Sequence, residues 1–198
     1  MITIPSDYNT AKAYDGNNNY KTLPAGGHIC RIIGARATQS RNGNDMIEVA
    51  FDIAENGDFD GMFKERFENN RKTKPDCKWP NGGMFRTSVL TKDGKTSGFF
   101  KGLITAVEES NPGYNFAATN GNEETMKGKL VGFNFGEEDY KANDGSIKTA
   151  VKAFYAISVQ TVRNGIEPPK KHDYKPRPGE SMANQGFTEV DPGDELPF

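Results

Sequence analysis

One short segment, MIEVAFDIAE at residues 46–55, limits the fold most strongly, because its large apolar residues stand at every second position. Successive side chains of a β-strand point to opposite faces of the sheet, so a period of two residues is typical of a strand with one buried face. The sequence therefore predicts a half-buried strand here. Its inward-facing residues are Ile47, Val49, Phe51 and Ile53.

Four further segments favour strands, because β-branched and aromatic residues are concentrated in them. Gly34 marks a bulge or bend in the first of the four. Two dipeptides, Asn42-Gly43 and Asp144-Gly145, are typical of hairpin turns. Residues 61–67 are a weaker candidate for a strand. The four strands are expected at 28–39, 82–91, 128–138 and 149–162, and the last of them has Val151, Ala153, Tyr155, Ile157 and Val159 on one face.

Residues 97–113 have a different period, because their apolar side chains recur at helical spacing until an Asn-Pro-Gly sequence ends the pattern. The predicted order is strand, strand, strand, helix, strand, strand. This is the element order of the OB-fold, a five-stranded Greek-key barrel with one helix between strands three and four. Other small barrels also combine a β-meander with one helix. The apolar positions of the helix are Phe100, Leu103, Ile104 and Val107.

The composition divides the chain of 198 residues into three parts. Residues 1–25 are polar and rich in Asn, which favours an N-terminal arm. Residues 26–164 contain all the expected strands and the helix, and form the predicted domain. Residues 165–198 hold six of the eleven prolines and lack apolar periodicity, so we expect a disordered linker that ends in an acidic interaction motif.

The stretch from residue 62 to residue 101 is strongly basic and carries aromatic residues among its charges. It contains ten lysines and arginines against four acids, although the formal net charge of the whole chain is −2. Lysine and arginine neutralise phosphates, and aromatic rings stack on unpaired bases. The sequence therefore predicts binding of single-stranded DNA, with a basic finger at 68–83. The expected DNA-binding residues are Lys64, Arg66, Phe67, Arg71, Lys72, Lys74, Lys78, Trp79, Phe85 and Arg86.

The aromatic residues of this stretch do not all fit one role. Trp79 is the only tryptophan and lies beside Pro80 in a polar run, so we expect an exposed or half-exposed ring that stacks on a base. Phe67 and Phe85 belong to the predicted site, but phenylalanines of this kind are more often core residues. Tyr140 and Tyr155 are weaker stacking candidates, and Tyr155 fits the core best.

Patterns of common catalytic and metal sites are absent from the sequence. It has no G-x-x-x-x-G-K-[ST], H-E-x-x-H or G-x-S-x-G motif. Its two cysteines and two histidines are not grouped as zinc ligands. Glu48 and Asp52 share a strand face, as the carboxylates of a metal-dependent nuclease do, but an outward polar face explains them more simply. We therefore expect no enzyme activity, no cofactor and no metal.

The sequence also bears on where the protein works. No run of about 18 apolar residues is present, which argues against a membrane span. The N-terminus MITIPSDYNT lacks the basic and apolar regions of a secretory signal. Two cysteines are too few for a disulfide framework. We expect a cytoplasmic protein that does not contact membranes.

The C-terminus places a large apolar ring, Phe198, beside the free carboxylate of the chain. The last five residues, DELPF, resemble the C-terminal tip of bacterial-type single-stranded DNA-binding proteins, although Pro192-Gly193 interrupts the acidic run. The body resembles the divergent single-stranded DNA-binding proteins of phages and prophages of low-GC Gram-positive bacteria. That similarity is carried by LPAGGHICRIIGA, FDIAENGDFDGMFKERF and ITAVEESNPGYNF, within residues 23–162.

The resemblance implies an OB-fold protein that coats single-stranded DNA during phage or prophage replication, recombination or repair. It also implies that the ring of Phe198 enters an apolar pocket of a partner protein. Family cores can be monomeric or can form homo-oligomers. The alternatives are an adaptor whose body binds protein, and a metal-dependent nuclease. The residues expected to bind partner proteins are Asp191, Asp194, Glu195, Leu196, Pro197 and Phe198.

Overall fold

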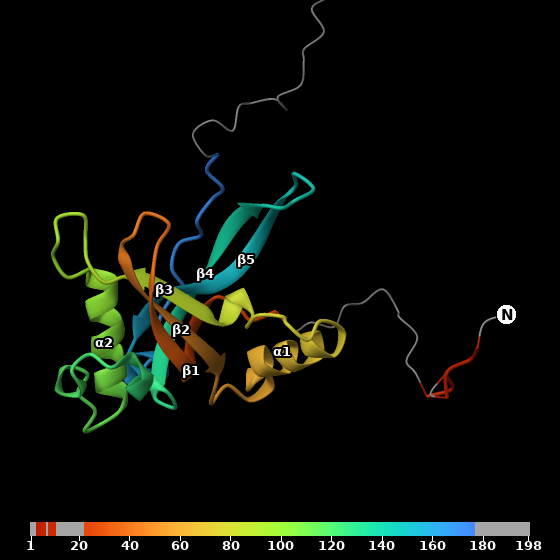
Figure 1. Ribbon diagram of the computed structural model, residues 1–198, viewed down its shortest axis with the longest axis horizontal. Coiled ribbons are helices and arrows are strands. Elements are labelled where there is room, and N and C mark those ends of the chain that lie inside the picture. Colours follow the sequence, from red (N-terminus) through yellow and green to blue (C-terminus); the bar gives the residue numbers. More distant parts are fainter. Residues whose placement is uncertain (1–2, 7, 11–21, 177–198) are drawn as a thin grey trace, which may run out of the picture.

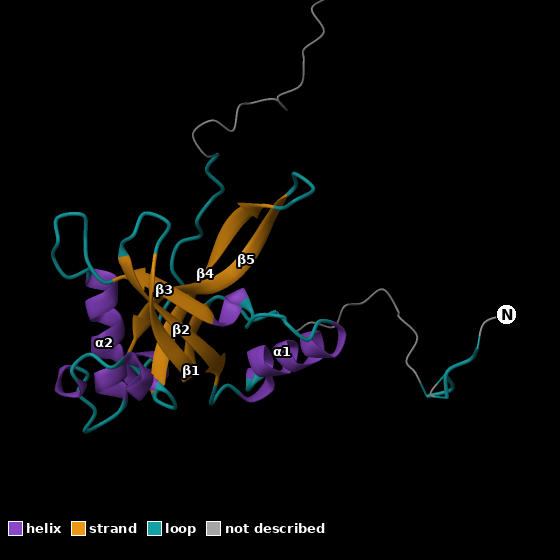
Figure 2. Ribbon diagram, viewed as in Figure 1, coloured by secondary structure: helices purple, strands orange, loops and turns teal. Residues whose placement is uncertain are grey.

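The computed structural model describes residues 3–6, 8–10 and 22–176, which form an open five-stranded antiparallel sheet with few helices (Figures 1 and 2). The strand order in the sheet is β3-β2-β1-β4-β5. The strands are β1 (Gly26–Gln39), β2 (Asp45–Ile53), β3 (Met84–Ser88), β4 (Leu130–Lys141) and β5 (Ile147–Ile157). The α-helices are α1 (Met62–Thr73), α2 (Gly98–Ser110) and α3 (Val159–Arg163).

The long strand β1 joins the two halves of the sheet. Its first residues, Gly26–Arg31, pair with β4, and its later residues pair with β2 as far as Gln39. The register with β2 shifts between Ile32 and Gly34, which confirms the predicted irregularity at Gly34. Because α2 lies between β3 and β4 in the chain, the strand and helix order is the predicted one, with α1 and α3 added.

The core lies between the inward face of the sheet and helix α2. The predicted inward face of β2 is confirmed, because Phe51 and its three alternating neighbours are buried. The expected outward position of Asp52 is wrong, because this residue is also buried. Phe51 contacts Phe133 of β4, with 4.5 Å between the ring centroids. The apolar stripe of α2 closes this core, as its spacing predicted, through the buried residues Leu103, Ile104 and Val107. Burial of these rings and aliphatic chains is the main force that holds the sheet and α2 together.

The weak prediction of a strand at 61–67 is wrong, because these residues begin helix α1. Gly61 precedes the helix with φ +72° and has no side chain to cap it. Asp52 of β2 supplies the cap instead, since its carboxylate accepts the backbone N–H of Phe63 at 2.9 Å and of Lys64 at 3.1 Å. Burial raises the pKa of Asp52, while these N–H donors oppose the rise.

The predicted strand at 149–162 extends too far. Strand β5 ends at Ile157, and the Ser158 hydroxyl accepts the N–H of Thr161 at 3.2 Å to begin α3. The predicted inward face is also wrong at Tyr155. Asn134 pairs with Tyr155 and Phe135 pairs with Ala153, so the residue between them, Phe154, is extra and shifts the alternation.

Residues 165–176, predicted as the first part of a disordered linker, are held against β4, and we call them the C-terminal strap. Strand β4 continues past Phe135, where its pairing with β1 ends. Its free edge is covered by His172, whose N–H donates to Glu137 O and whose carbonyl accepts from Asp139 N, both at 2.8 Å. Nearer the start of the strap, Asn134 Nδ2 donates to Glu167 O at 2.9 Å.

The remaining terminal predictions lie mostly outside the described residues. The acidic motif at 177–198, with all six predicted partner-binding residues, lies outside them. Of the predicted N-terminal arm, Leu23 is buried against the core and therefore belongs to the folded body. Across 3–6, 8–10 and 22–176, no helix combines the length and the apolar character that crossing a bilayer requires.

Candidate nucleic-acid interface

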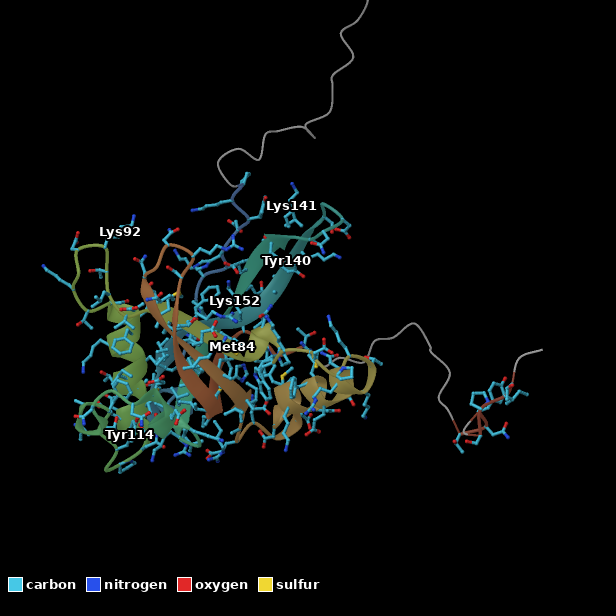
Figure 3. All side chains as sticks on the ribbon, viewed as in Figure 1. Met84, Lys92, Tyr114, Tyr140, Lys141 and Lys152 are labelled. Atoms are coloured by element: carbon cyan, nitrogen blue, oxygen red, sulfur yellow. The ribbon has the colours of Figure 1, made fainter. Side chains whose placement is uncertain are left out.

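Four hollows adjoin one another across the sheet, and we call them together the trough. They measure about 620, 490, 590 and 960 Å³, in order from the C-terminal end of α1 to the β4–β5 hairpin. Each hollow shares lining residues with the next: Lys78, then Met84 and Arg86, then Glu138 and His172. In Figure 3, Met84, Lys152 and Tyr140 follow one another along this path from the middle of the sheet toward the hairpin tip.

The trough is lined by basic and aromatic side chains from distant parts of the sequence. Its lining contains nine lysines and arginines against five acids. The basic residues are Arg36, Lys74, Lys78, Arg86, Lys141, Lys152, Lys170, Lys171 and Lys175. The aromatic residues are Trp79, Phe85, Phe99, Tyr140, Phe154, Tyr155, His172 and Tyr174.

The structure brings half of the predicted DNA-binding residues into the trough. Lys74, Lys78, Trp79 and Arg86 line it with their side chains, and Phe85 borders it from the core side of β3. The other five lie on helix α1, outside the lining of the four hollows, and several of them interact within the helix. The ammonium of Lys64 lies 3.9 Å from Glu68, and the guanidinium of Arg71 lies over the ring of Phe67 at 5.6 Å. The five residues on α1 are Lys64, Arg66, Phe67, Arg71 and Lys72.

Trp79 is half-buried, as expected, but it is firmly anchored to the sheet. Its Nε1–H donates to the carbonyls of Phe51, at 3.2 Å, and Gly83, at 3.1 Å. Its ring packs against Phe67, with 5.4 Å between the centroids. Only part of the ring therefore faces the trough, and the residue also joins the loop before β3 to β2.

Phe85 cannot stack on a base, which corrects the prediction for this residue. Only 5% of its surface is exposed, and its ring contacts Phe133 in the core at a centroid distance of 5.2 Å. Strand alternation explains the difference, because Phe85 points inward while Met84 and Arg86 point toward the trough. The general preference of phenylalanine for the core was the better guide here.

Two arginines are held side by side on the outer face of β1, β2 and β3. Glu48 accepts hydrogen bonds from Arg86 Nε at 2.6 Å and from Arg36 Nε at 2.7 Å. The hydrogen bond from Arg86 does most to lower the pKa of Glu48, and Arg36 adds to the effect. One carboxylate thus positions two guanidinium groups, and their remaining N–H donors can bind phosphate oxygens.

The predicted carboxylate pair therefore has two separate roles: Glu48 orders the two arginines, while Asp52 caps α1. In the part of the chain that the structure describes, no group of three or more His, Cys, Asp and Glu residues is placed to hold a metal ion. The two cysteines there are both free thiols, with Cys30 buried and Cys77 partly exposed. Burial and the nearby charge of Asp52 raise the pKa of Cys30 well above its usual value.

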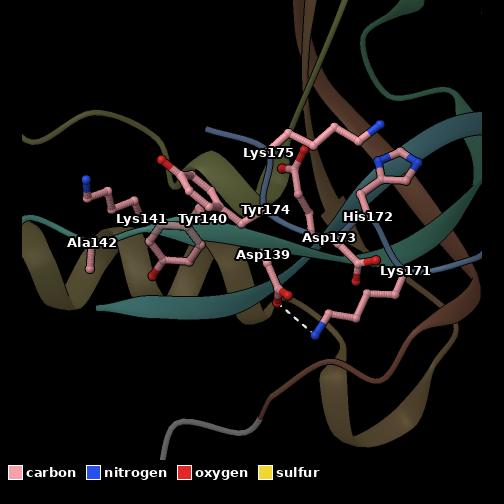
Figure 4. A pocket seen from close by; sticks show the side chains of 10 residues that line it. Asp139, Tyr140, Lys141, Ala142, Lys171, His172, Asp173, Tyr174 and Lys175 are labelled. Carbon is pink, nitrogen blue, oxygen red and sulfur yellow. Dashed lines mark ion pairs between the residues drawn. The ribbon is translucent and has the colours of Figure 1, made fainter. Parts of the chain in front are cut away.

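The far end of the trough lies between the β4–β5 hairpin and the strap (Figure 4). Lys171 forms an ion pair with Asp139 at 2.8 Å, and this contact, together with the hydroxyl of Thr149, lowers the pKa of Asp139. Lys152 of β5 forms an ion pair with Glu138 of β4. Tyr140 stays 44% exposed near the hairpin tip, and its ring lines this part of the trough.

Sequence reasoning missed most of the residues at this end. The signal in β5 was the pair Lys152 and Phe154, which alternate with the predicted inward-facing residues. The signal in the strap was the basic and aromatic run KKHDYK, which lies within the predicted linker. The residues missed are Arg36, Phe99, Lys141, Lys152, Phe154, Lys170, Lys171, His172, Tyr174 and Lys175.

The trough offers a chain-like ligand repeated contacts of two kinds. Guanidinium and ammonium groups bind phosphates, and exposed rings bind flat apolar surfaces. Basic groups or rings occur in each of the four hollows, so the contacts continue along the whole path. No protein-family model matches the sequence, and no curated protein is similar to it.

Proposed function

We propose that this protein binds single-stranded DNA along the trough, without strong sequence preference. The observation that carries the proposal is the row of four adjoining hollows, whose lining contains nine lysines and arginines together with aromatic residues. A single strand presents regularly spaced phosphates and bases whose flat faces are free to stack. Duplex DNA keeps its bases stacked on one another, so aromatic rings in the trough favour the unpaired strand.

The proposed fold is an OB-fold. In its support, the sheet order is β3-β2-β1-β4-β5, and α2 lies between β3 and β4 in the chain. OB-folds bind oligonucleotides on the face of strands two and three and on the loops between strands one and two and strands four and five. The trough crosses β2 and β3 and reaches the β4–β5 hairpin, so it includes that face and one of those two loops.

The binding assay that tests this function compares labelled oligo(dT) with a duplex of the same length, using the full chain and fluorescence anisotropy. We expect tight binding to oligo(dT). The logarithm of the association constant is expected to fall linearly with the logarithm of the salt concentration, because phosphate contacts release counterions. Equal affinity for duplex and single strand, or absence of binding, contradicts the proposal. An oligo(U) arm measures the preference for DNA over RNA.

The acidic C-terminal motif completes the proposed role in phage or prophage replication, recombination or repair, inside the bacterial cytoplasm. Phe198 is proposed to enter an apolar pocket of a partner, and Pro197 reduces the backbone entropy lost on binding. Deletion of Phe198 is expected to abolish capture of host replication and repair proteins while the affinity for oligo(dT) stays unchanged. Capture that survives the deletion contradicts this part of the proposal.

A further inference from the structure

Strand β5 carries an outward aromatic ring at an irregular position. Phe154 is the extra residue of the β-bulge between β4 and β5. Its ring lies across Gly136 of β4, where an added Cβ would approach the ring atoms to 2.5–2.8 Å. A side chain at Gly136 would therefore displace the ring. Bulges that redirect a side chain are frequent next to binding sites, and this one presents Phe154 to the trough.

The strap places a second ring on top of the first. The imidazole of His172 stacks on Phe154, with 4.2 Å between the ring centroids and 18° between the planes. Backbone hydrogen bonds to Glu137 and from Asp139, both 2.8 Å long, hold the His172 main chain on β4. The strap is thus fixed by its backbone, and the His172 side chain stays exposed.

The position of this stack along the trough bears on its role. His172 lines both the third and the fourth hollow, so it lies where the two hollows adjoin. Lys152 and Lys170 line the third hollow beside it. Lys170 makes no ion pair with any residue within 3–6, 8–10 and 22–176, so its ammonium is available for a phosphate.

We infer that the His172–Phe154 stack is a base-stacking site, and that the strap is part of the nucleic-acid interface rather than a linker. The ligand is an unpaired base that stacks on the imidazole, with its flanking phosphates near Lys152 and Lys170. This inference rests on the proposed function, because it assigns one subsite of the proposed single-stranded DNA interface. Its chemistry is that of aromatic stacking, which accepts any of the four bases.

The two histidines of the chain allow a direct test by NMR of the imidazole C–H signals in the full-length protein. His28 is buried, and its ring nitrogens contact Pro24 O at 2.8 Å and Asn56 Nδ2 at 2.6 Å, so it serves as an internal reference. On titration with oligo(dT), the His172 signals are expected to shift with saturation, because a stacked base adds a ring current. The His28 signals are expected to stay in place.

The outcomes separate this inference from the function on which it rests. If anisotropy reports binding while the His172 signals do not move, the stacking site is refuted and the proposed function stands. If oligo(dT) does not bind at all, the proposed function fails and the inference fails with it. A shift of both histidines to a similar extent indicates a global rearrangement and also contradicts a local stack.

Two substitutions measure the contribution of the ring. His172→Ala is expected to weaken oligo(dT) binding by about five- to tenfold, the low end of what one stacked base contributes. His172→Phe keeps a ring and is expected to bind within about twofold of the natural chain. Hydrogen exchange at the Asp139 amide, which donates to His172 O, reports whether the strap stays in place. Full affinity of His172→Ala, or equal losses in both variants, refutes the stacking role.

Discussion

Helix α1 and the hairpin end of the trough are both basic, but they place their charges differently. The lysines and arginines of α1 follow closely in the sequence, and the helix directs them to several sides, since each residue is rotated by about 100° from the last. At the other end, Lys141, Lys152, Lys170, Lys171 and Lys175 come from β4, β5 and the strap, and all of them line one surface. A dense run of charge in the sequence is therefore a weaker sign of a binding site than charges that converge in space.

The aromatic residues beside helix α1 and at the hairpin end also differ. The indole N–H of Trp79 donates to two backbone carbonyls, and much of its ring packs against Phe67. Trp79 therefore stabilises the fold. The outer ring of the hairpin end, His172, packs on Phe154 and stays exposed. The first region thus anchors one end of the trough, while the second presents rings to a ligand.

The largest expected effect tests the anchoring role of Trp79. Trp79→Ala removes two hydrogen bonds and the packing on Phe67, and is expected to lower the free energy of unfolding by about 2–3 kcal/mol. Urea denaturation measures it. Trp79→Phe retains the ring packing, so it is expected to lose about 1 kcal/mol. If Trp79→Ala is as stable as the natural chain and loses only DNA affinity, Trp79 belongs to the ligand rather than to the fold.

A second comparison removes the same number of charges from each region. The double variant Lys152→Ala/Lys170→Ala is expected to weaken oligo(dT) binding by about tenfold, ~1.4 kcal/mol, because both residues line the trough. The slope of log affinity against log salt is expected to fall by about 1.4, since each single-strand phosphate contact contributes about 0.7.

The matched control is Lys64→Ala/Lys72→Ala on helix α1, outside the lining of the trough. Exposed charges more than about 8 Å from a phosphate are largely screened at physiological salt, so the control is expected to change affinity by less than about twofold. Equal losses in the two double variants contradict the distinction between the regions.

The smallest expected effect concerns His28. This residue of β1 is buried beside Phe135 of β4 and lies outside the trough lining. Burial lowers the pKa of His28 below its ordinary value of 6.5. Above that pH the imidazole is neutral in both folded and unfolded chains. As the pH falls below about 6.5, the unfolded chain binds the proton first, so the stability of the folded protein decreases.

Unfolding in urea between pH 7.5 and pH 5.5 checks this, with His28→Gln as the reference. The natural chain is expected to lose more stability over this window than the variant does. The same slope in both proteins contradicts a neutral buried His28.

Local patterns were sufficient to predict most of the sheet and helix α2. The alternation at Phe51 and the helical spacing at Leu103 each report directly which face is buried. Helix α1 was missed because its cap, Asp52, comes from the preceding strand rather than from the residue before the helix. The strap was missed because its partner is the free edge of β4, more than thirty residues earlier in the chain.

The site was harder to predict than the fold for a related reason. A single extra residue at Phe154 reverses the expected direction of Tyr155, and a period-two pattern does not reveal such a bulge. The stack with His172 then depends on a contact between segments that are distant in sequence. The sequence marks the whole segment 62–101 as basic, but of its charged residues only those in the middle part, Lys74, Lys78 and Arg86 with Asp76 between them, line the trough.

The path of the DNA is tested most directly by photo-crosslinking the full-length protein to oligo(dT) that contains 4-thiothymidine at single positions, followed by mass spectrometry of the linked peptides. Crosslinks are expected in the peptides that contain Trp79, Tyr155 and His172, in an order that follows the position of the photoreactive base along the strand. Crosslinks confined to helix α1 between Lys64 and Lys72, or spread over the surface without order, contradict a single strand lying along the trough.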